Sequence, residues 1–365
     1  MRVGLYIPGI DKASVEAPTK YQINLARALA DLNDVKLFLL HHRNAHTLNI
    51  NAKHIIISDR TPILWEIKLR KCNLDIIHFN RIPTTTLRVF FRLLNCKKVA
   101  TIHGDFHWLR ETFGDYGRLN YRIRRLMEPW MSKFMDAIIM VSNDLRLRLA
   151  PHLQVSETKI GVVYEGVNSK YRPIKNVSYI KEKYNIHHPF IFHVSNLHPR
   201  KNPRTLIKAF SQLEKNFDLE LVIAGAKWNN GNVRSLIEKL DLVSNIKILG
   251  YVPEWDLIRL YNAAELFFFP SFHENFGFPV IEAMACGTPV VTSDAYSIPE
   301  IAGDAAVLCD PRDYHEFVDA MRQVLKDREL REKMVKKGLE NAKRFSWERC
   351  AAETTKVYKQ LLSAD

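Results

Sequence analysis

The chain has 365 residues, of which 47% are hydrophobic and 25% are charged, so it is long enough for two globular domains and has the composition of a folded protein. No apolar run approaches the roughly 18–20 residues that span a bilayer, and the N-terminal apolar run is too short for a signal peptide. The five cysteines are odd in number and form no CxxC pair, which argues against a disulfide framework or a zinc site. A reducing, cytoplasmic location is therefore expected.

Positive charge is concentrated in the first half of the chain. The whole sequence holds 53 Lys and Arg against 40 Asp and Glu, a net charge of +13, and residues 1–172 alone hold 27 basic and 15 acidic side chains. The remaining residues hold 26 basic and 25 acidic side chains. This asymmetry predicts that the first half meets an anionic membrane surface, a phosphorylated substrate or nucleic acid, unless the excess serves solubility alone.

Along the chain, short apolar runs alternate with amphipathic stretches such as Tyr21–Leu32, which is typical of βαβ units that build parallel sheets. In the first half, strands are predicted at Val3–Ile7, Val35–Leu40, Ile76–Phe79, Val99–Ile102, Ala137–Val141 and Ile160–Val163. In the second half, strands are predicted at Phe190–Val194, Leu219–Ala224, Ile246–Leu249, Leu266–Phe269, Val290–Thr292 and Ala306–Leu308. The polar stretch at 172–182 separates the two series. The pattern therefore predicts two doubly wound α/β domains, followed by a last helix in FSWERCAAETTKVYKQLL.

The segment 273–289, HENFGFPVIEAMACGTP, follows the predicted strand at 266–269. Ligands of open α/β sheets bind at the carboxyl ends of strands, where loops enter helices. Gly277 permits close approach of the backbone, and Pro279 suits the first position of a helix. The N–H groups around Phe276–Val280 are then expected to face a crevice, where they would bind an anion such as a diphosphate.

Two glutamates, Glu274 and Glu282, flank this Gly-Phe-Pro turn. Carboxylates are poor ligands for phosphate, but they are good acceptors for the hydroxyl groups of sugars beside a phosphate. One carboxylate is therefore expected to bind a sugar and the other a ribose. Ordinary surface glutamates at a helix start would explain one of the two more easily than both.

The segment HENFGFPVIEAMACGTPVVTSDAYSIPEIAGDAA resembles the E-x7-E region of retaining GT-B glycosyltransferases of family 4, and VSNLHPRKNPRTLIKAF resembles the strand, loop and helix that carry the family's basic phosphate clamp. Weaker similarities extend over nearly the whole chain. The resemblance implies a GT-B architecture: an acceptor-binding Rossmann-like domain at 1–172, a nucleotide-sugar-binding Rossmann-like domain at 173–345, and a C-terminal helix at 346–365 that crosses back to the first domain.

The resemblance also implies roles for the E-x7-E segment. Glu282 would accept hydrogen bonds from the ribose of a nucleotide-sugar, and Glu274 would bind hydroxyls of the donor sugar as a catalytic residue. The backbone amides of Phe276, Gly277 and Phe278 would hold the sugar and its β-phosphate. Fixed amides and cations stabilise the negative charge that develops on a departing nucleoside diphosphate.

Further residues follow from the same resemblance. Arg200 and Lys201 would neutralise the diphosphate; two cations at a helix start are otherwise unfavourable unless an anion lies there. His103, directly after the strand at 99–102, would act as a catalytic residue against the donor sugar. His78 and Gly9 are weaker candidates for acceptor or cleft positions.

The sequence departs from the family pattern at three places. Asn196 stands where an arginine is usual, which leaves Arg200 as its substitute. Glu16-Ala17 replaces paired glycines, and Tyr164-Glu165 replaces a commoner Pro-Asn.

The resemblance implies transfer with retention of anomeric configuration and without a metal or other cofactor, since the nucleotide-sugar is a co-substrate. The sequence contains no Asp-x-Asp pair, and no carboxylate is identifiable as a nucleophile. The leaving diphosphate would help to deprotonate the acceptor hydroxyl. The expected reaction moves a hexose-type sugar from a GDP- or UDP-sugar to a hydroxyl of a glycan or lipid-linked acceptor in cell-surface glycan synthesis.

Residues 81–148 hold 13 basic and 6 acidic side chains between apolar ones. In RLNYRIRRLMEPWMSKFM, one helical face carries six apolar residues: Leu119, Ile123, Leu126, Met127, Trp130 and Phe134. This pattern predicts an interfacial helix that binds anionic lipid, kinked or split at Pro129, on the inner face of the cytoplasmic membrane. The alternative is a helix that packs this stripe into its own domain.

Two other classes of function remain as alternatives. A catalytically silent nucleotide-sugar-binding or scaffold subunit of the same fold would fit the departures from the family pattern. Nucleic-acid binding by the basic half lacks a recognisable motif and is not expected. Dehydrogenase chemistry is disfavoured because no G-x-G-x-x-G follows a strand.

Overall fold

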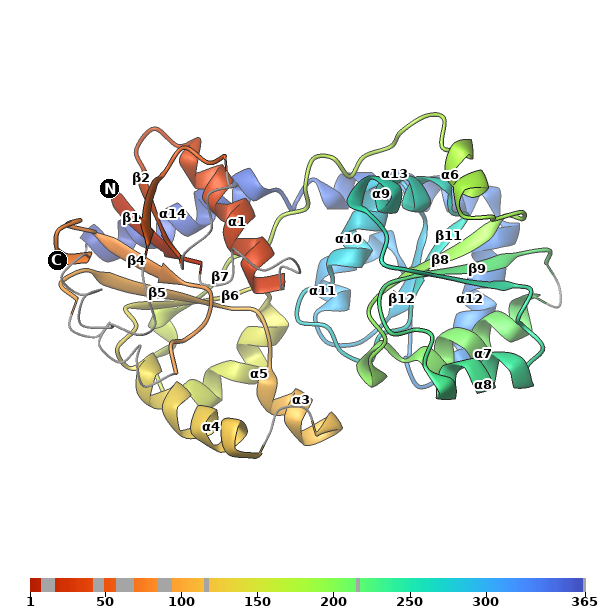
Figure 1. The fold of residues 1–365 in the computed structure, drawn as a ribbon, viewed down its shortest axis with the longest axis horizontal. Helices are drawn as coiled ribbons and strands as arrows, with labels where there is room; N and C mark the ends of the chain where they lie inside the picture. The colour runs from red at the N-terminus through yellow and green to blue at the C-terminus, as the bar shows by residue number, and fades with distance from the viewer. Residues whose placement is uncertain are drawn as a thin grey trace. The chain divides into compact units, whose positions relative to one another are not determined.

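The computed structural model describes seven segments of the chain: 1–7, 17–41, 49–56, 69–84, 94–114, 118–214 and 217–363. The chain divides into two compact units. The first unit is formed by Met1–Gly166 together with Trp347–Asp365, and the second by Val167–Ser346 (Figure 1). Each unit has its own sheet, so each can be described by itself.

The first unit contains a seven-stranded sheet in the order β3-β2-β1-β4-β5-β6-β7, with every neighbouring pair parallel. Its strands are β1 (Arg2–Tyr6), β2 (Lys36–His41), β3 (Lys53–Ile56), β4 (Ile76–Phe79), β5 (Lys97–Ile102), β6 (Ala137–Met140) and β7 (Ile160–Val162). Six of them coincide with predicted strands to within two residues. The seventh, β3, was not predicted: it is four residues long, lies at the sheet edge and is only partly buried, so it lacks a buried apolar run.

Helices connect these strands. They are α1 (Ala17–Ala30), α3 (Phe106–Phe113), α4 (Arg118–Ser132), α5 (Asn143–Leu153) and, from the end of the chain, α14 (Trp347–Ser363), with a 3₁₀ turn, η2 (Glu157–Lys159). Helix α14 packs against α1 within this unit. Its Tyr358 is fully buried, and its Lys359 Nζ lies 2.7 Å from Asp34 Oδ2. No helix in the described part of the chain is both long enough and apolar enough to cross a membrane.

The second unit contains a six-stranded parallel sheet in the order β10-β9-β8-β11-β12-β13. Its strands are β8 (Phe190–Val194), β9 (Glu220–Ala224), β10 (Ile246–Gly250), β11 (Leu266–Phe269), β12 (Val290–Ser293) and β13 (Val307–Cys309). All six were predicted to within one residue. Their central strands are mostly apolar and are buried on both faces, as expected for a sheet that helices cover on both sides.

The helices of the second unit are α6 (Ser178–Lys183), α7 (Pro203–Glu214), α8 (Gly231–Lys239), α9 (Glu254–Ala263), α10 (Phe278–Ala285), α11 (Ile298–Ala302), α12 (Tyr314–Lys326) and α13 (Arg328–Ala342), with 3₁₀ turns η3 (Pro199–Lys201) and η4 (Gly303–Ala305). Helices α7 and α12 pack together, and one apolar core joins them to the sheet. Trp228, Phe268, Phe317 and Met321 are among its fully buried side chains.

Candidate functional site

The strand order reverses between β8 and β11 of the second unit. Strand β8 continues through β9 to β10 on one side, whereas β11 continues through β12 to β13 on the other. Because β8 and β11 are parallel, their carboxyl ends lie at the same edge of the sheet. Ligands of doubly wound sheets bind at such a reversal point. The loops after these two strands carry Arg200, Lys201 and Glu274.

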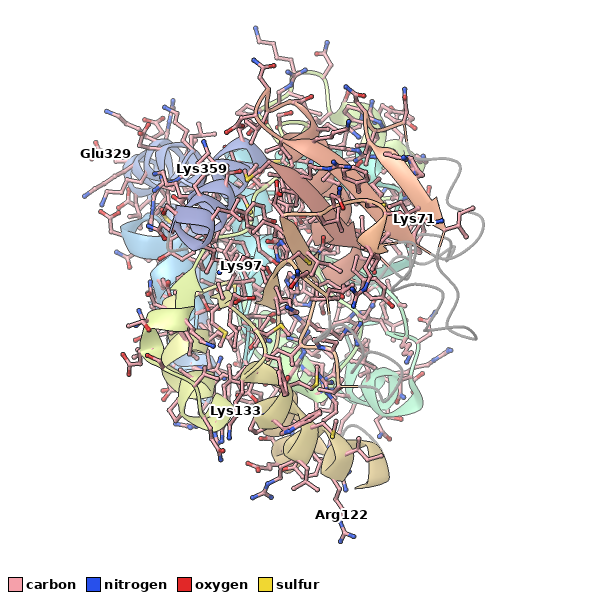
Figure 2. The ribbon with its side chains drawn as sticks, turned by 90° about the vertical axis from the view of Figure 1, so that its left-hand side faces the viewer. Lys71, Lys97, Arg122, Lys133, Glu329 and Lys359 are labelled. Atoms are coloured by element: carbon pink, nitrogen blue, oxygen red, sulfur yellow. The ribbon has the colours of Figure 1, made fainter. Side chains whose placement is uncertain are left out.

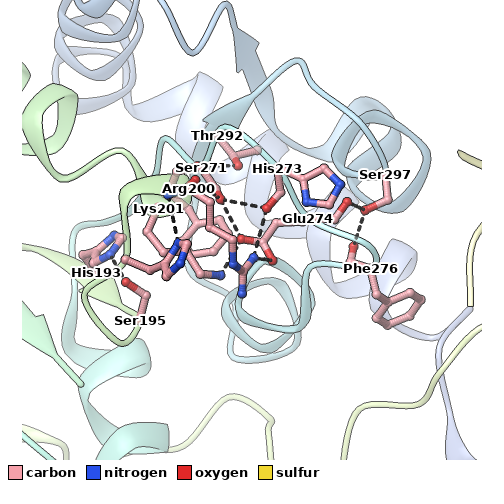
Figure 3. A network of polar contacts seen from close by, with 12 residues as sticks. His193, Ser195, Arg200, Lys201, Ser271, His273, Glu274, Phe276, Thr292 and Ser297 are labelled. Carbon is pink, nitrogen blue, oxygen red and sulfur yellow. Dashed lines mark hydrogen bonds and ion pairs between the residues drawn. The ribbon is translucent and has the colours of Figure 1, made fainter. Parts of the chain in front are cut away.

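Glu274 is the centre of a buried charge cluster (Figure 3). Its Oε2 accepts a hydrogen bond of 3.0 Å from Arg200 Nη1, and its Oε1 accepts one of 2.6 Å from Ser271 Oγ. Lys201 Nζ also donates to Oε1. Arg200 Nη1 donates in addition to the carbonyl of His273, at 3.0 Å. Two cations and one anion leave this cluster with one excess positive charge.

The pKa values follow from this arrangement. Burial alone would raise the pKa of Glu274, but the charges of Lys201 and Arg200 and the hydrogen bonds from Lys201 and Ser271 outweigh it and lower the pKa to about 2. Burial lowers the pKa of Lys201 to about 8, against the opposing effect of Glu274. Glu274 is therefore ionised at neutral pH. Lys201 loses its proton just above neutral pH.

The protein's own carboxylate compensates the cations at this helix start. The sequence predicts an external anion there, but the carboxylate of Glu274 already neutralises one of the two positive charges. A diphosphate would therefore meet the one excess charge and would compete with Glu274 for Lys201 and Arg200.

The loop that follows Glu274 is held by Ser297. Ser297 Oγ lies 2.9 Å from the carbonyl oxygen of Glu274 and 3.2 Å from that of Phe276. Its single hydroxyl proton is thus shared between two carbonyl groups of the loop. The loop ends at Gly277, which has a φ of 103°. This backbone conformation favours glycine, and a Cβ here would lie 2.7 Å from Ile298 Cδ1, the end of a side chain that would have to shift.

We expect Gly277→Ala to lower the free energy of unfolding by about 1–3 kcal/mol, because alanine is strained at positive φ and its Cβ meets Ile298. Urea unfolding measures the change. The Ile298→Val background removes Cδ1 and so separates the two causes. In that background Gly277→Ala should lower the unfolding free energy by less, and the cost that remains comes from the positive φ alone. An equal cost in both backgrounds would show that the steric contact contributes nothing.

Helix α10 begins after Gly277, with Pro279 in its first turn as predicted. The N–H of Val280 donates to the carbonyl of Gly277, at 3.0 Å. The prediction that the amides from Phe276 to Val280 all face a ligand is therefore wrong for Val280. Only the amides of residues 276–278 remain candidates for an anion.

Glu282, one turn into α10, is held from helix α9. Tyr261 Oη donates to Glu282 Oε2 at 2.9 Å, and Tyr171 also interacts with this carboxylate. Burial and the nearby Glu282 raise the pKa of both tyrosines, so both stay protonated and can donate hydrogen bonds. These tyrosines could not be predicted as partners of Glu282 from the sequence, because each lies on another segment of the chain.

Asn196 has a structural role in the loop after β8. Its Oδ1 accepts the backbone N–H of Ala226, at 2.9 Å, and so joins the loops after β8 and β9. The two loops meet closely, since a Cβ at Gly225 would lie 1.9 Å from the carbonyl oxygen of Ser195. The same carbonyl accepts a hydrogen bond of 2.6 Å from Trp228 Nε1. The side-chain amide of Asn196 therefore stands where the family usually has arginine. Arg200 is the arginine that reaches Glu274.

In the first unit, His103 directly follows β5, as predicted. Its Nδ1 lies 2.6 Å from Glu165 Oε1, and the two side chains are 10% and 4% exposed. The ring of Tyr21 packs edge-on against His103, with 4.4 Å between centroids. Glu165, which the sequence analysis noted only as a departure, is thus the direct partner of a predicted catalytic residue.

His78 has no nitrogen left for a ligand. Its Nδ1 pairs with Tyr358 Oη at 2.6 Å and its Nε2 with Thr101 Oγ1 at 2.7 Å, and its side chain is fully buried. Burial lowers its pKa to about 3, so it is neutral. The expectation that His78 lines a cleft is corrected: it links β4 to α14 and β5. Gly9 and Glu16 lie outside the described residues.

The structure thus joins Arg200, Lys201 and Glu274 in one cluster, and places the turn of Phe276, Gly277 and Phe278 next to it in the chain. Glu282 is positioned separately by tyrosines. Among the residues that contribute to these sites, sequence reasoning missed five: Ser271, Ser297, Tyr171, Tyr261 and Glu165. Ser271, directly after a buried strand, could have been found by the rule that located Glu274.

Two known families match consecutive segments of the chain. A family described as Glycosyltransferase Family 4 matches residues 19–171, and one described as Glycosyl transferases group 1 matches residues 178–341. An O-antigen chain mannosyltransferase B from Escherichia coli is 40% identical over 175 residues, which are 47% of this chain and 46% of the relative. A D-inositol 3-phosphate glycosyltransferase from Corynebacterium glutamicum is 27% identical over 254 residues, which are 66% of this chain and 61% of the relative. The matches span less than two thirds of either relative.

Solved structures share the fold along the whole chain. A sucrose-phosphate synthase from Thermosynechococcus elongatus superposes with a TM-score of 0.82 at 20% identity and covers 100% of both chains. WaaG, a glycosyltransferase involved in lipopolysaccharide biosynthesis, has a TM-score of 0.72 at 16% identity and covers 98% of this chain and 99% of its own. The two parallel sheets define a GT-B fold. The chain belongs to the GT-B glycosyltransferases, with a family 4 segment followed by a group 1 segment.

Proposed function

We propose that this protein transfers mannose from a nucleotide-activated donor to a hydroxyl of a growing cell-surface glycan. The observation that carries the proposal is the cluster of Arg200, Lys201 and Glu274 at the reversal point of the second sheet. Its excess positive charge suits a diphosphate, and its carboxylate suits a sugar hydroxyl. The choice of mannose rests on the 40% identity with an O-antigen chain mannosyltransferase.

The chemistry of the site supports this reaction. As the bond between the sugar and the diphosphate breaks, negative charge grows on the leaving group, and Arg200 and Lys201 would stabilise it from fixed positions. We infer that these cations take the place of a metal ion. We also infer retention of configuration, in which the leaving diphosphate deprotonates the acceptor hydroxyl on the same face. Glu282, held by the hydrogen bond from Tyr261, would bind the ribose.

A silent nucleotide-sugar-binding subunit remains the second candidate. The departure at Asn196 no longer favours it, because Asn196 joins two loops and Arg200 supplies the charge. Turnover distinguishes the two candidates, since both predict donor binding.

The test is a panel of GDP-mannose, UDP-glucose and ADP-glucose. We expect one of them, with GDP-mannose favoured, to raise the melting temperature and to be hydrolysed slowly without acceptor. With an acceptor glycan, NMR of the product should show an α-linkage if the donor sugar is α-linked. Binding without hydrolysis or transfer would support the silent subunit. Absence of any thermal shift with all three donors would contradict both candidates.

We further propose that helix α4 docks this enzyme on anionic lipid at the inner face of the cytoplasmic membrane, where a lipid-linked acceptor would be found. Ile123, Leu126 and Trp130 are 44%, 75% and 37% exposed, so this part of the apolar stripe is not packed into the domain. Arg122 and Arg125 are exposed beside it, and Figure 2 shows Arg122 projecting away from the helix. Exposed basic and apolar side chains together favour an interfacial position.

Other features of α4 also bear on this proposal. Its inward residues include Glu128, Met131 and Ser132, which are buried. The helix continues through Pro129, so the predicted split is wrong there. The side chain of Leu119 lies outside the described residues.

Replacing Leu126 with glutamate is expected to reduce binding to vesicles that contain anionic lipid by about tenfold, because an apolar contact is lost and a charge opposes the surface. Co-sedimentation with such vesicles measures the effect. Leu147→Glu is the matched control, since Leu147 is 77% exposed on α5, away from the α4 stripe in sequence. Equal binding of both variants and the parent protein would contradict the docking role of α4.

A further inference from the structure

Glu165 and His103 form a buried pair at the edge of the first sheet where the strands end. His103 follows β5 and Glu165 follows β7, and the two strands flank β6. The two residues are 62 positions apart in sequence, but parallel strands bring their carboxyl ends to one edge. The distance from His103 Nδ1 to Glu165 Oε1 is 2.6 Å, and Glu165 is 4% exposed.

The contact with Glu165 bears on which nitrogen of the imidazole carries the proton. An ionised carboxylate only accepts hydrogen bonds, so Nδ1 must carry the proton that joins it to Glu165. The other nitrogen of His103, Nε2, is buried and has no hydrogen-bond partner among the residues that the structure describes. A buried nitrogen without a partner is costly, unless a ligand supplies one. In the neutral ring, Nε2 then carries a lone pair and can only accept.

Three titratable neighbours of the pair among the described residues, Tyr21, Cys350 and His78, are neutral. Burial raises the pKa of Tyr21 and of Cys350, in each case with a contribution from the charge of Glu165. Burial lowers the pKa of His78 to about 3. These neighbours therefore do not supply a charge that could replace Glu165 in orienting His103.

We propose that Glu165 is a positioning residue that holds the proton of His103 on Nδ1, so that Nε2 accepts a hydrogen bond from a hydroxyl of the bound sugar. Its place in the reaction rests on the proposed function. The tautomer itself does not, and can be tested in the absence of any donor. Without the carboxylate, the ring can move its proton to Nε2 and would then present a donor where the substrate needs an acceptor.

The test compares the parent protein with Glu165→Gln, which keeps the size but can accept or donate, and Glu165→Asp, which keeps the charge. Glu157→Gln is the matched control, because Glu157 is 85% exposed in the same unit and pairs only with Arg146 among the contacts observed. Nitrogen-15 NMR of the imidazoles reports each tautomer. The His103 signals among the 14 histidines are assigned by their loss in His103→Gln.

We expect the proton on Nδ1 in the parent, Glu157→Gln and Glu165→Asp proteins, and a shift toward Nε2 in Glu165→Gln. Glu165→Gln should lower kcat about tenfold or more with a change in donor KM of less than about threefold, and Glu165→Asp should restore much of kcat. If His103 of the parent protein carried its proton on Nε2, the inference would be overturned. So would an unchanged kcat, or a lower kcat with an unchanged tautomer, in Glu165→Gln. If no donor is turned over, the proposed function fails, while the tautomer still decides whether Glu165 orients His103.

Discussion

Replacing Glu274 with alanine is expected to have the largest effect on this protein. It leaves Lys201 and Arg200 without their buried anion, and removing one partner of a buried ion pair costs about 3–5 kcal/mol of unfolding free energy. The pKa of Lys201 is already about 8, so Lys201 can lose its proton and avoid an unpaired buried charge. The cost should therefore be about 3 kcal/mol. Urea unfolding at neutral pH measures the change. Glu254→Ala is the control in the same unit, because its ion pair with Lys170 is about half exposed and should matter little.

The same variant should separate the binding of diphosphate from the transfer of sugar. In the parent protein, a diphosphate must compete with Glu274 for the two cations. In Glu274→Ala, GDP should therefore bind at least as tightly as in the parent protein, whereas sugar transfer should fall about 100-fold or more because the contact with the sugar hydroxyl is lost. Calorimetry with GDP and a transfer assay measure the two quantities. If GDP binding and transfer fell together, Glu274 would not be the residue that divides sugar from diphosphate.

Replacing Lys201 with methionine is expected to weaken donor binding by about 10- to 100-fold, because one charge-assisted hydrogen bond to the diphosphate is lost. Methionine fills much of the same volume, so the buried position beside Phe269 should remain packed. The change should lower kcat/KM as well. Lys208→Met serves as the control, because Lys208 lies on α7 of the same unit and packs over Tyr314 instead. Unchanged donor affinity would remove Lys201 from the phosphate site.

Donor affinity should also depend on pH through Lys201. Its pKa in the free protein is about 8, so the ammonium form dominates below this pH and the neutral form above it. A diphosphate prefers the ammonium form and raises its pKa on binding. Affinity should therefore be constant below about pH 7 and should fall by up to about tenfold per pH unit as pH rises beyond 8. Lys201→Arg, which stays charged, should abolish this fall. A profile of the same shape in both proteins would assign the dependence to another group.

Much of the fold follows from local sequence. Buried strands such as β8 and β11 are apolar runs between turn residues, and their bounds were predicted without error. The conformation of Gly277 and the start of α10 follow from adjacent residues as well. The edge strand β3 was missed because an edge strand need not carry a buried run. These properties depend on residues a few positions apart, which is why periodicity and turn chemistry find them.

The partners of the functional side chains could not be predicted in this way. Glu274 meets Lys201 from 73 residues away, and Glu165 meets His103 from 62. His78, inside the strand at 76–79 and near its end, was also a candidate, yet it lies between Tyr358 and Thr101 in the core. Residue type alone does not distinguish the two histidines.

The sequence by itself determined the two series of strands, the turn between Glu274 and Glu282, and the residues proposed to bind a diphosphate and a sugar. Only the tertiary structure decided which cations Glu274 compensates and that Glu165 is the partner of His103. The physical reason is that these choices depend on the order of strands in each sheet. That order is set by the packing of whole elements, and it brings together loops that no local pattern connects.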